Sequence, residues 1–230
     1  MSTFILTVLV VMLSILLYGA MIQVYVRFPL PFLMPAVTST CVIIASLLIL
    51  RIPYETYMIG AKWIHFFLGP SVVSLAYPLY KHWELLKKNW RALLAGITIG
   101  AVTGMVSGVG FARLLGFSQE LVYALLPKSI TTPVAMQIAM ELNSIPSLAA
   151  VFVMIAGFSG VILGPYLLRW LRIDSAVGRG IGFGTASHAI GTAKATEYSQ
   201  ETVSVSSVAM TVSAVIGSFL GPFVAWLFYL

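Results

Sequence analysis

The sequence predicts an all-α, polytopic integral membrane protein of one domain, with broken or re-entrant helices. Of the 230 residues, 60% are hydrophobic and 9% are charged, against about 25% charged residues in soluble domains. Several stretches reach the roughly 20 apolar residues that a helix needs to cross the hydrocarbon core. Three of these stretches are interrupted by proline, glycine or polar residues, which break a continuous helical hydrogen-bond ladder.

Eight apolar segments have helical length and are expected to be embedded in the membrane. They are Ser2 to Val26, Leu33 to Leu50, Met58 to Tyr80, Ala92 to Leu115, Leu121 to Met140, Leu148 to Leu168, Ala176 to Ala195 and Val203 to Phe228. The first has no preceding basic residue and no clear small-residue cleavage site. It is therefore predicted to be a retained span rather than a signal peptide.

Enzyme chemistry is not expected from this chain. It has one cysteine, Cys41, and three widely separated histidines, so neither a disulfide framework nor a zinc spacing is present. It also lacks a phosphate-binding Gly-rich loop and a Gly-x-Ser-x-Gly elbow. We expect no catalytic residue, metal or cofactor. The net charge of +6 lies mainly in loops, where basic residues set orientation, so nucleic acid is not an expected partner.

The first two interrupted segments each contain two prolines. Pro70 and Pro78 bracket seven residues of Met58 to Tyr80, where a straight helix is not expected. Pro127 and Pro133 flank a cluster of hydroxyl side chains and a lysine. Such breaks build the substrate site in many transporters. A proline that merely kinks a packed helix is the alternative for each of them.

The third interruption is Gly182 to Ala195, a run of small residues that carries one histidine and one lysine. In helical geometry Gly180, Gly184, Ser187, Gly191 and Lys194 would line one stripe. Close packing through the pairs Gly180–Gly184 and Ser187–Gly191 explains this stripe as well as ligand binding does. The two explanations are compatible.

Polar residues at the three interruptions are the candidate substrate-binding residues: Ser71, Ser74, Tyr77, Lys128, Ser129, Thr131, Thr132, Ser187, His188, Thr192 and Lys194. Structural roles are expected for Gly69, Pro70, Pro78, Pro133, Gly184 and Gly191. Hydroxyls and backbone N–H groups at a helix break suit an anion, and a membrane-embedded lysine needs a partner or water. The implied ligand is a small carboxylate. Snorkelling of either lysine, a structural hydrogen bond from His188 and an aromatic-belt role for Tyr77 are the alternatives.

A shift of 115 residues aligns segment boundaries in the two halves, 1–115 and 116–230, and sets Gly69 on Gly184. This coincidence suggests an internal repeat, which is inverted in many transporters. The basic loop Lys81 to Arg91 is expected in the cytoplasm. Arg169, Arg172 and Arg179 favour the same side, whereas a simple inverted repeat requires the opposite side, so the topology stays open.

Three motifs, in this order, resemble the LrgB/CidB family of bacterial membrane proteins: Leu68 to Lys81, Leu126 to Thr131 and Gly184 to Ala193. Pro31 to Pro35 and Gly60 to Ile64 also match early segments of that family. The chain departs from the family pattern at Met34, Ala61 and Asn143, where asparagine, glycine and glycine are usual. The segments Tyr77 to Lys81 and Lys128 to Thr131 are similar to the CidB branch rather than to LrgB proper.

The resemblance implies a multi-pass protein of the bacterial plasma membrane that works with a small LrgA/CidA-type membrane protein. Family members are described as holin-like or antiholin-like modulators of murein hydrolase activity and cell lysis. Related proteins, including a plastid member, move glycolate and glycerate, and some bacterial pairs move pyruvate. We therefore expect transport of small monocarboxylates, with an indirect effect on autolysis. A holin-like assembly, which would form homo-oligomers, is the rival function.

Overall fold

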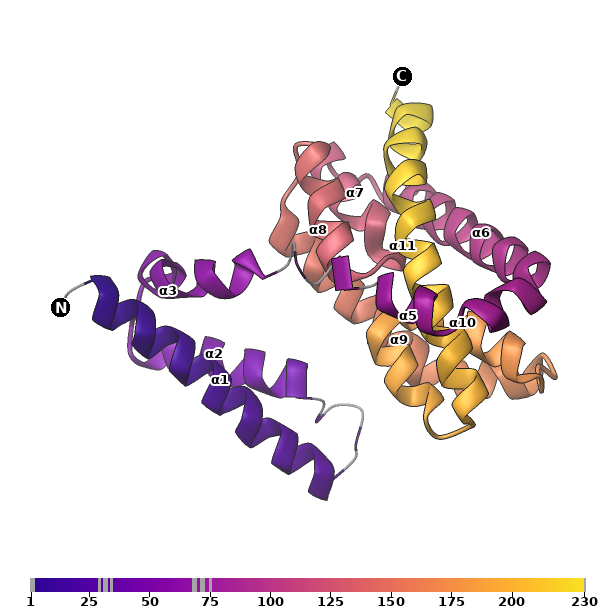
Figure 1. Cartoon of the computed structure of the whole chain (residues 1–230). Helices are drawn as coiled ribbons and strands as arrows, with labels where there is room; N and C mark the ends of the chain where they lie inside the picture. Colours follow the sequence, from indigo (N-terminus) through magenta and orange to yellow (C-terminus); the bar gives the residue numbers. More distant parts are fainter. Residues whose placement is uncertain are drawn as a thin grey trace. The chain divides into compact units, whose positions relative to one another are not determined.

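The computed structural model describes residues 3–28, 30, 33, 35–67, 70, 73–74 and 76–229. The chain divides into two compact units, Met1–Ser71 and Val72–Leu230. All regular elements in the described residues are helical (Figure 1). The predicted all-α class is therefore confirmed.

The first unit contains three helices, α1 (Thr3–Arg27), α2 (Pro35–Ile49) and α3 (Tyr54–Phe66). Helix α1 packs against both of the others. Gly60 allows α3 to approach closely, because a Cβ atom there would lie 2.5 Å from Cβ of Val10. One turn away from these contacts, the hydroxyls of Ser14 and Tyr57 lie 3.2 Å apart.

The second unit contains the remaining elements: α5 (Ala76–Lys81), α6 (Trp83–Leu114), α7 (Gln119–Leu125), the 3-10 turn η2 (Leu126–Ser129), α8 (Thr132–Glu141), α9 (Pro146–Trp170), α10 (Ala176–Ala195) and α11 (Gln200–Tyr229). Helices α10 and α11 form the most extensive packing of the unit and run beside each other in Figure 1. Buried apolar side chains of α6 and α11 pack with those of α7, η2 and α8 in one cluster, and two smaller clusters join α6 to α11 and α9 to α10.

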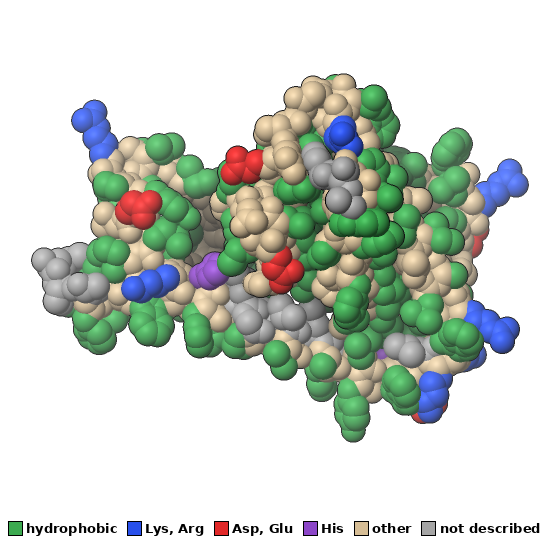
Figure 2. Space-filling model, turned by 90° about the horizontal axis from the view of Figure 1, so that it is seen from above, with side chains coloured by type: hydrophobic (Ala, Val, Ile, Leu, Met, Phe, Trp, Pro, Cys, Tyr) green, Lys and Arg blue, Asp and Glu red, His purple; other side chains and the backbone are tan. Residues whose placement is uncertain are grey.

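Four described helices are long and apolar enough to cross a membrane: Phe4–Arg27, Lys87–Leu114, Pro146–Trp170 and Gln200–Phe228. Hydrophobic side chains cover much of the face in Figure 2. Large apolar side chains such as Leu114, Phe219 and Trp170 are more than three-quarters exposed. An apolar exterior of this kind suits lipid rather than water.

Eight complete spans are not confirmed. In the predicted segment Met58 to Tyr80, α3 already ends at Phe66, and α5 begins at Ala76. The segments Leu121 to Met140 and Ala176 to Ala195 are broken in the middle. The internal repeat is not confirmed either. A shift of 115 residues sets the broken region α7–η2–α8 against α1, a helix of 25 residues.

Elements α7, η2 and α8 form a helical hairpin, residues 119–144, which we call the first hairpin. Pro127 lies in η2, Ile130 is extended with φ −134° and ψ 160°, and α8 starts with Pro133 in its first turn. The chain thus reverses, and Ser144 at its end donates to the carbonyl of Glu120 at its start, 2.6 Å away. The predicted break at the two prolines is confirmed.

Helix α10 also folds back on itself, together with residues up to 199, to form the second hairpin. The reversal occurs at His188, whose φ of 50° and ψ of −128° are non-helical. As a result Gly191 packs on the backbone carbonyl of Phe183, and the rings of Phe183 and Tyr198 lie 5.5 Å apart. The stripe expected for one continuous helix was therefore wrong beyond His188, because the helix turns back there.

Candidate functional site

The turn of the first hairpin, residues 128–131, is called here the Lys128 tip. Nζ of Lys128 donates to the carbonyl of Gly104 on α6 at 2.8 Å, and it lies 3.4 Å from Oγ of Ser129. Thr131 is buried and occupies the N-cap position of α8, where its side chain makes no capping hydrogen bond. The backbone N–H groups of the first turn of α8 therefore point toward this tip with the positive end of the helix dipole.

The turn of the second hairpin, Ser187 with His188, is called here the His188 tip. His188 is 3% exposed and Ser187 is 1% exposed. Oγ of Ser187 has no hydrogen-bond partner among the described residues, and neither ring nitrogen of His188 has a well-formed one, although the imidazole lies close enough to the backbone of Lys128 and Gly184 for weak interactions. Buried polar groups are usually paired, because an unpaired one costs about 1–3 kcal/mol. Three such atoms at one turn mark a site that a ligand can satisfy.

The left-handed backbone of His188 adds a second free-energy cost to that of the unpaired polar atoms. A φ of 50° with a ψ of −128° belongs to the region that glycine occupies freely and other residues avoid. Non-glycine residues held in such regions cost of order 1–3 kcal/mol and cluster at functional sites. The chain thus keeps a histidine where glycine would fit its backbone better.

The two tips meet beside α6. The imidazole of His188 lies next to the backbone of Gly184 and of Lys128, and it is within electrostatic reach of the Lys128 side chain. Helix α10, which carries the His188 tip, is also in contact with η2, which carries Lys128. Polar groups from two hairpins, which are far apart in the sequence, therefore form one cluster, which we call the tip cluster; Thr131, Ser187 and His188 are buried in it, and Lys128 and Ser129 are partly buried.

A row of glycines at four-residue spacing on α6 makes this approach possible. A Cβ atom at Gly104 would lie 2.6 Å from Oγ of Ser129, and one at Gly108 would lie 2.9 Å from Cε of Lys128. One and two turns earlier, Gly100 and Gly96 face the first arm of the second hairpin. Both hairpins thus rest on one helix face that has no side chains.

Glycines of α9 and α10 close the other sides of the second hairpin. Gly160 of α9 faces Oγ of Ser187, and Gly164 lies against the ring of Phe183. Gly184 of α10 packs on the carbonyl of Ser206 and on Ala209 of α11. Nearby, the hydroxyls of Thr192 and Ser206 lie 2.9 Å apart. The hairpin is therefore held between α6, α9 and α11.

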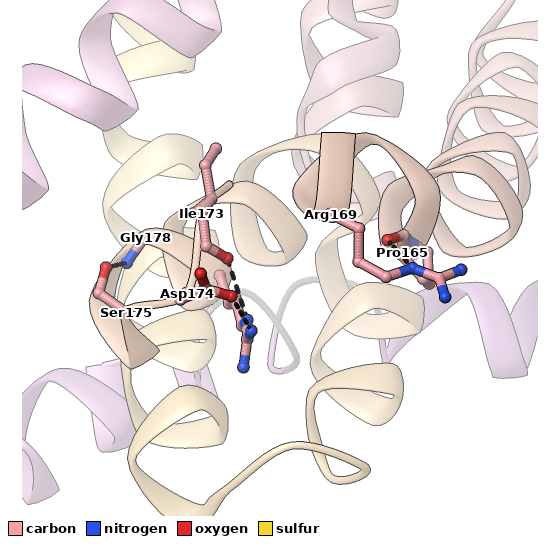
Figure 3. A network of polar contacts seen from close by, with 7 residues as sticks. Pro165, Arg169, Ile173, Asp174, Ser175 and Gly178 are labelled. Carbon is pink, nitrogen blue, oxygen red and sulfur yellow. Dashed lines mark hydrogen bonds and ion pairs between the residues drawn. The ribbon is translucent and has the colours of Figure 1, made fainter. Parts of the chain in front are cut away.

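Polar contacts hold the open end of the second hairpin. Oγ of Ser175 accepts a hydrogen bond from the backbone N–H of Gly178, and the Arg179 guanidinium donates to Asp174 at 2.8 Å and to the carbonyl of Ile173. Figure 3 shows this network at the start of α10. Arg179 also lies over the ring of Tyr198, which joins the two ends of the hairpin. The charged groups at this end lie toward the surface, and the neutral groups lie at the tip.

Lys128 and Lys194 differ in their surroundings. Lys194 forms an ion pair with Glu197 at 2.6 Å. The described residues give Lys128 no carboxylate partner; its hydrogen bonds go to a carbonyl and a hydroxyl. A cation whose hydrogen bonds go only to neutral groups keeps its charge unneutralised, so it can bind an anion.

The structure brings some of the candidate residues together and places others elsewhere. Lys128, Ser129, Thr131, Ser187 and His188 lie in the two tips, Thr132 begins α8, and Thr192 follows in the second arm. Ser74 and Tyr77 are exposed on the part of the chain before α6. Ser71 and Gly69 lie outside the described residues, as does the side chain of Pro78, and Pro70 is exposed. Pro133 lies in the first turn of α8, directly after the first break, and Gly191 lies three residues after the second break at His188.

Two features of the second unit were not predicted from the sequence. One is the glycine row on α6, which is visible as Gly96, Gly100, Gly104 and Gly108. The regular four-residue spacing of these glycines was the sequence signal from which the row could have been predicted. The other is Ser213 on α11, a fully buried residue whose hydroxyl has no partner among the described residues. Nothing in its local sequence distinguishes it from the other hydroxyl residues of α11.

Long apolar helices, two hairpins and a buried polar cluster together define a polytopic helical membrane protein. The model of the LrgB-like family matches residues 14–227. This chain belongs to that family, so the resemblance seen in the three sequence motifs is confirmed.

Named relatives agree with this assignment. The chain is 54% identical to the uncharacterized protein YxaC of Bacillus subtilis (strain 168) over 223 residues, which is 97% of each chain. It is 37% identical to the holin-like protein CidB of Staphylococcus aureus (strain Mu50 / ATCC 700699) over 229 residues, the full length of each. CidB of Staphylococcus epidermidis is 36% identical over the same length. No solved structure matches this chain.

Proposed function

We propose that this protein carries small monocarboxylates, of the pyruvate, lactate, glycolate or glycerate class, across the bacterial cell membrane. The observation that carries the proposal is the tip cluster: among the described residues, Lys128 has no carboxylate partner, and the Ser187 hydroxyl and the His188 ring nitrogens have no well-formed hydrogen bond. Hairpins that enter a membrane from one side and end in polar tips are the kind of broken helix that builds transporter sites.

Each part of the tip cluster has a role in this proposal. The ammonium of Lys128 neutralises the carboxylate, and charge-assisted hydrogen bonds of this kind are about twice as strong as neutral ones. The hydroxyls of Ser129 and Ser187 and the imidazole of His188 bind the remaining oxygens. The first turn of α8 adds backbone donors and its dipole. One cation in the cluster suits one negative charge, which favours a monocarboxylate over a dicarboxylate.

The proposal is tested by uptake of labelled pyruvate, lactate, glycolate and glycerate into vesicles. The vesicles hold the protein with a small LrgA/CidA-type membrane protein, the partner that we propose for it. Uptake of at least one acid above empty vesicles is expected. Background uptake of all four would remove the main support for a carrier.

In the same assay, His188→Ala is expected to lower uptake at limiting substrate about tenfold, because a hydrogen bond to a charged ligand contributes about 1.5–3 kcal/mol. The matched control is His65→Ala, since His65 is exposed near the end of α3. Equal uptake by the two variants would show that His188 does not bind the ligand.

The names of the CidB relatives favour a second candidate, a holin-like function. Homo-oligomers of this protein would then open a nonselective lesion, or restrain another protein that does so, and would change autolysis directly. Vesicles that contain the protein should in that case release dyes of several sizes. A carrier should retain those dyes while it takes up a carboxylate, so the two measurements separate the candidates.

A further inference from the structure

Ser213 on α11 has an unusual environment for a helical serine. Serine and threonine in a helix commonly donate to a carbonyl of the preceding turn, and Ser204, Thr211 and Ser218 on α11 do so. Ser213 is fully buried, yet its hydroxyl has no partner among the described residues. It shares this state with Ser187 and His188 of the tip cluster.

The contacts of α10 with α11, continued by one turn, bring the His188 tip to the level of Ser213. A Cβ atom at Gly180 would lie 2.5 Å from Cβ of Val205, and one at Gly184 would lie 2.8 Å from Cβ of Ala209. Four residues along α10 therefore advance the contact by four residues along α11 in the same direction. One further turn sets His188 at the level of Ser213.

The other side of Ser213 borders the first hairpin. Gly217, one turn after Ser213 on the same helix face, packs on the side chain of Ile130 in the Lys128 tip. Ala214, the next residue after Ser213, belongs to the apolar core that contains Ile130. Ser213 therefore lies on α11 at the level of the His188 tip and one turn before the level of the Lys128 tip.

We propose that Ser213 is a ligand-binding residue of the tip cluster, and that its hydroxyl donates to an oxygen of the bound carboxylate. This inference rests on the proposed carrier function. It extends the site from the two hairpins to a third element, the last long helix of the chain. The helix that packs along the second hairpin thereby also contacts the ligand.

The first test compares Ser213→Ala with Thr211→Val. In Ser213→Ala the pyruvate concentration for half-maximal uptake should rise about tenfold, because a donor to a charged ligand is lost. Its melting temperature in detergent without pyruvate should stay level or rise, since the Ser213 hydroxyl makes no hydrogen bond to any described residue. Thr211→Val removes a hydrogen bond within the helix and should leave half-saturation unchanged. An unchanged half-saturation in Ser213→Ala overturns the proposal.

A second test does not depend on uptake. Cys41 is the only cysteine, so Ser213→Cys and Ala214→Cys can each be placed in a Cys41→Ala chain, in membranes with the partner. Ser213→Cys should react with a small charged methanethiosulfonate, and pyruvate should slow the reaction. Ala214→Cys, in the apolar core, should not react. An unreactive Ser213→Cys overturns the inference. This outcome counts even if Ser213→Ala proves less stable than the wild type, because the labelling test does not depend on that variant.

The two tests separate failure of this inference from failure of the carrier function. If the wild type takes up no carboxylate while Ser213→Cys reacts and Ala214→Cys does not, the carrier proposal fails and Ser213 still faces a water-accessible path. If the wild type takes up pyruvate and Ser213→Cys is unreactive, the carrier proposal stands and Ser213 only packs.

Discussion

Replacing Lys128 with glutamine is expected to lower pyruvate uptake about 100-fold at limiting substrate. The ammonium is the one cationic group of the tip cluster, and its hydrogen bonds go to the carbonyl of Gly104 and the hydroxyl of Ser129. Loss of a charge-assisted hydrogen bond costs about 1.5–3 kcal/mol, and each 1.4 kcal/mol is a factor of ten. Glutamine retains a donor for Gly104 but cannot neutralise a carboxylate.

The matched control for this variant is Lys194→Gln, which removes the same charge from the second hairpin. Lys194 is already paired with Glu197, so uptake should change less than threefold. The measurement is the initial rate of labelled pyruvate uptake into vesicles with equal amounts of protein. Equal losses in the two variants would mean that net charge, rather than Lys128, controls uptake.

Replacing Gly184 with alanine is expected to destabilise the second unit by about 3 kcal/mol, at the upper end of the usual cost of overpacking. The added Cβ atom would meet the carbonyl of Ser206, Cβ of Ala209 at 2.8 Å and the backbone nitrogen of Met210 at 3.1 Å. Two of these three atoms are backbone, which cannot move away as a flexible side chain can. The second hairpin would therefore have to separate from α11.

The control is Gly110→Ala, because a Cβ atom at Gly110 on α6 meets nothing within 4 Å. Alanine in an open helical position is expected to stabilise by about 0.5–1 kcal/mol. Thermal unfolding of both variants in the same detergent, followed by circular dichroism, measures the difference. If the Gly184→Ala and Gly110→Ala proteins had the same melting temperature, this result would contradict the packing between α10 and α11.

The sequence predicted the class of fold because apolar length and helix-breaking residues are local properties. Pro127 and Pro133 mark the turn of the first hairpin, since proline removes a backbone donor wherever it stands. The turn at His188 has no proline beside it. Small residues indicated an interruption there, but the reversal shows only in contacts that a continuous helix would not allow, such as Gly191 on Phe183, eight residues earlier.

Part of the candidate site was predictable for the same reason. Lys128 and His188 were identified because ionisable groups are rare in apolar segments. Ser213 was not, since a helical serine usually satisfies its own hydroxyl, and nothing in the local sequence marks this one as different. Lys194 and Glu197 stand three residues apart, a spacing at which helical ion pairs form. The local sequence therefore supplies a carboxylate partner for Lys194, and it supplies none for Lys128.

The backbone at His188 implies a compromise between durability and activity. Glycine would adopt a φ of 50° and a ψ of −128° without the cost of about 1–3 kcal/mol that a side chain incurs. Selection for heat resistance alone would therefore favour glycine at position 188, and the same change would delete the imidazole from the tip cluster. Stabilising changes at functional sites commonly reduce function in this way. The histidine is consistent with selection for what its ring does at the tip.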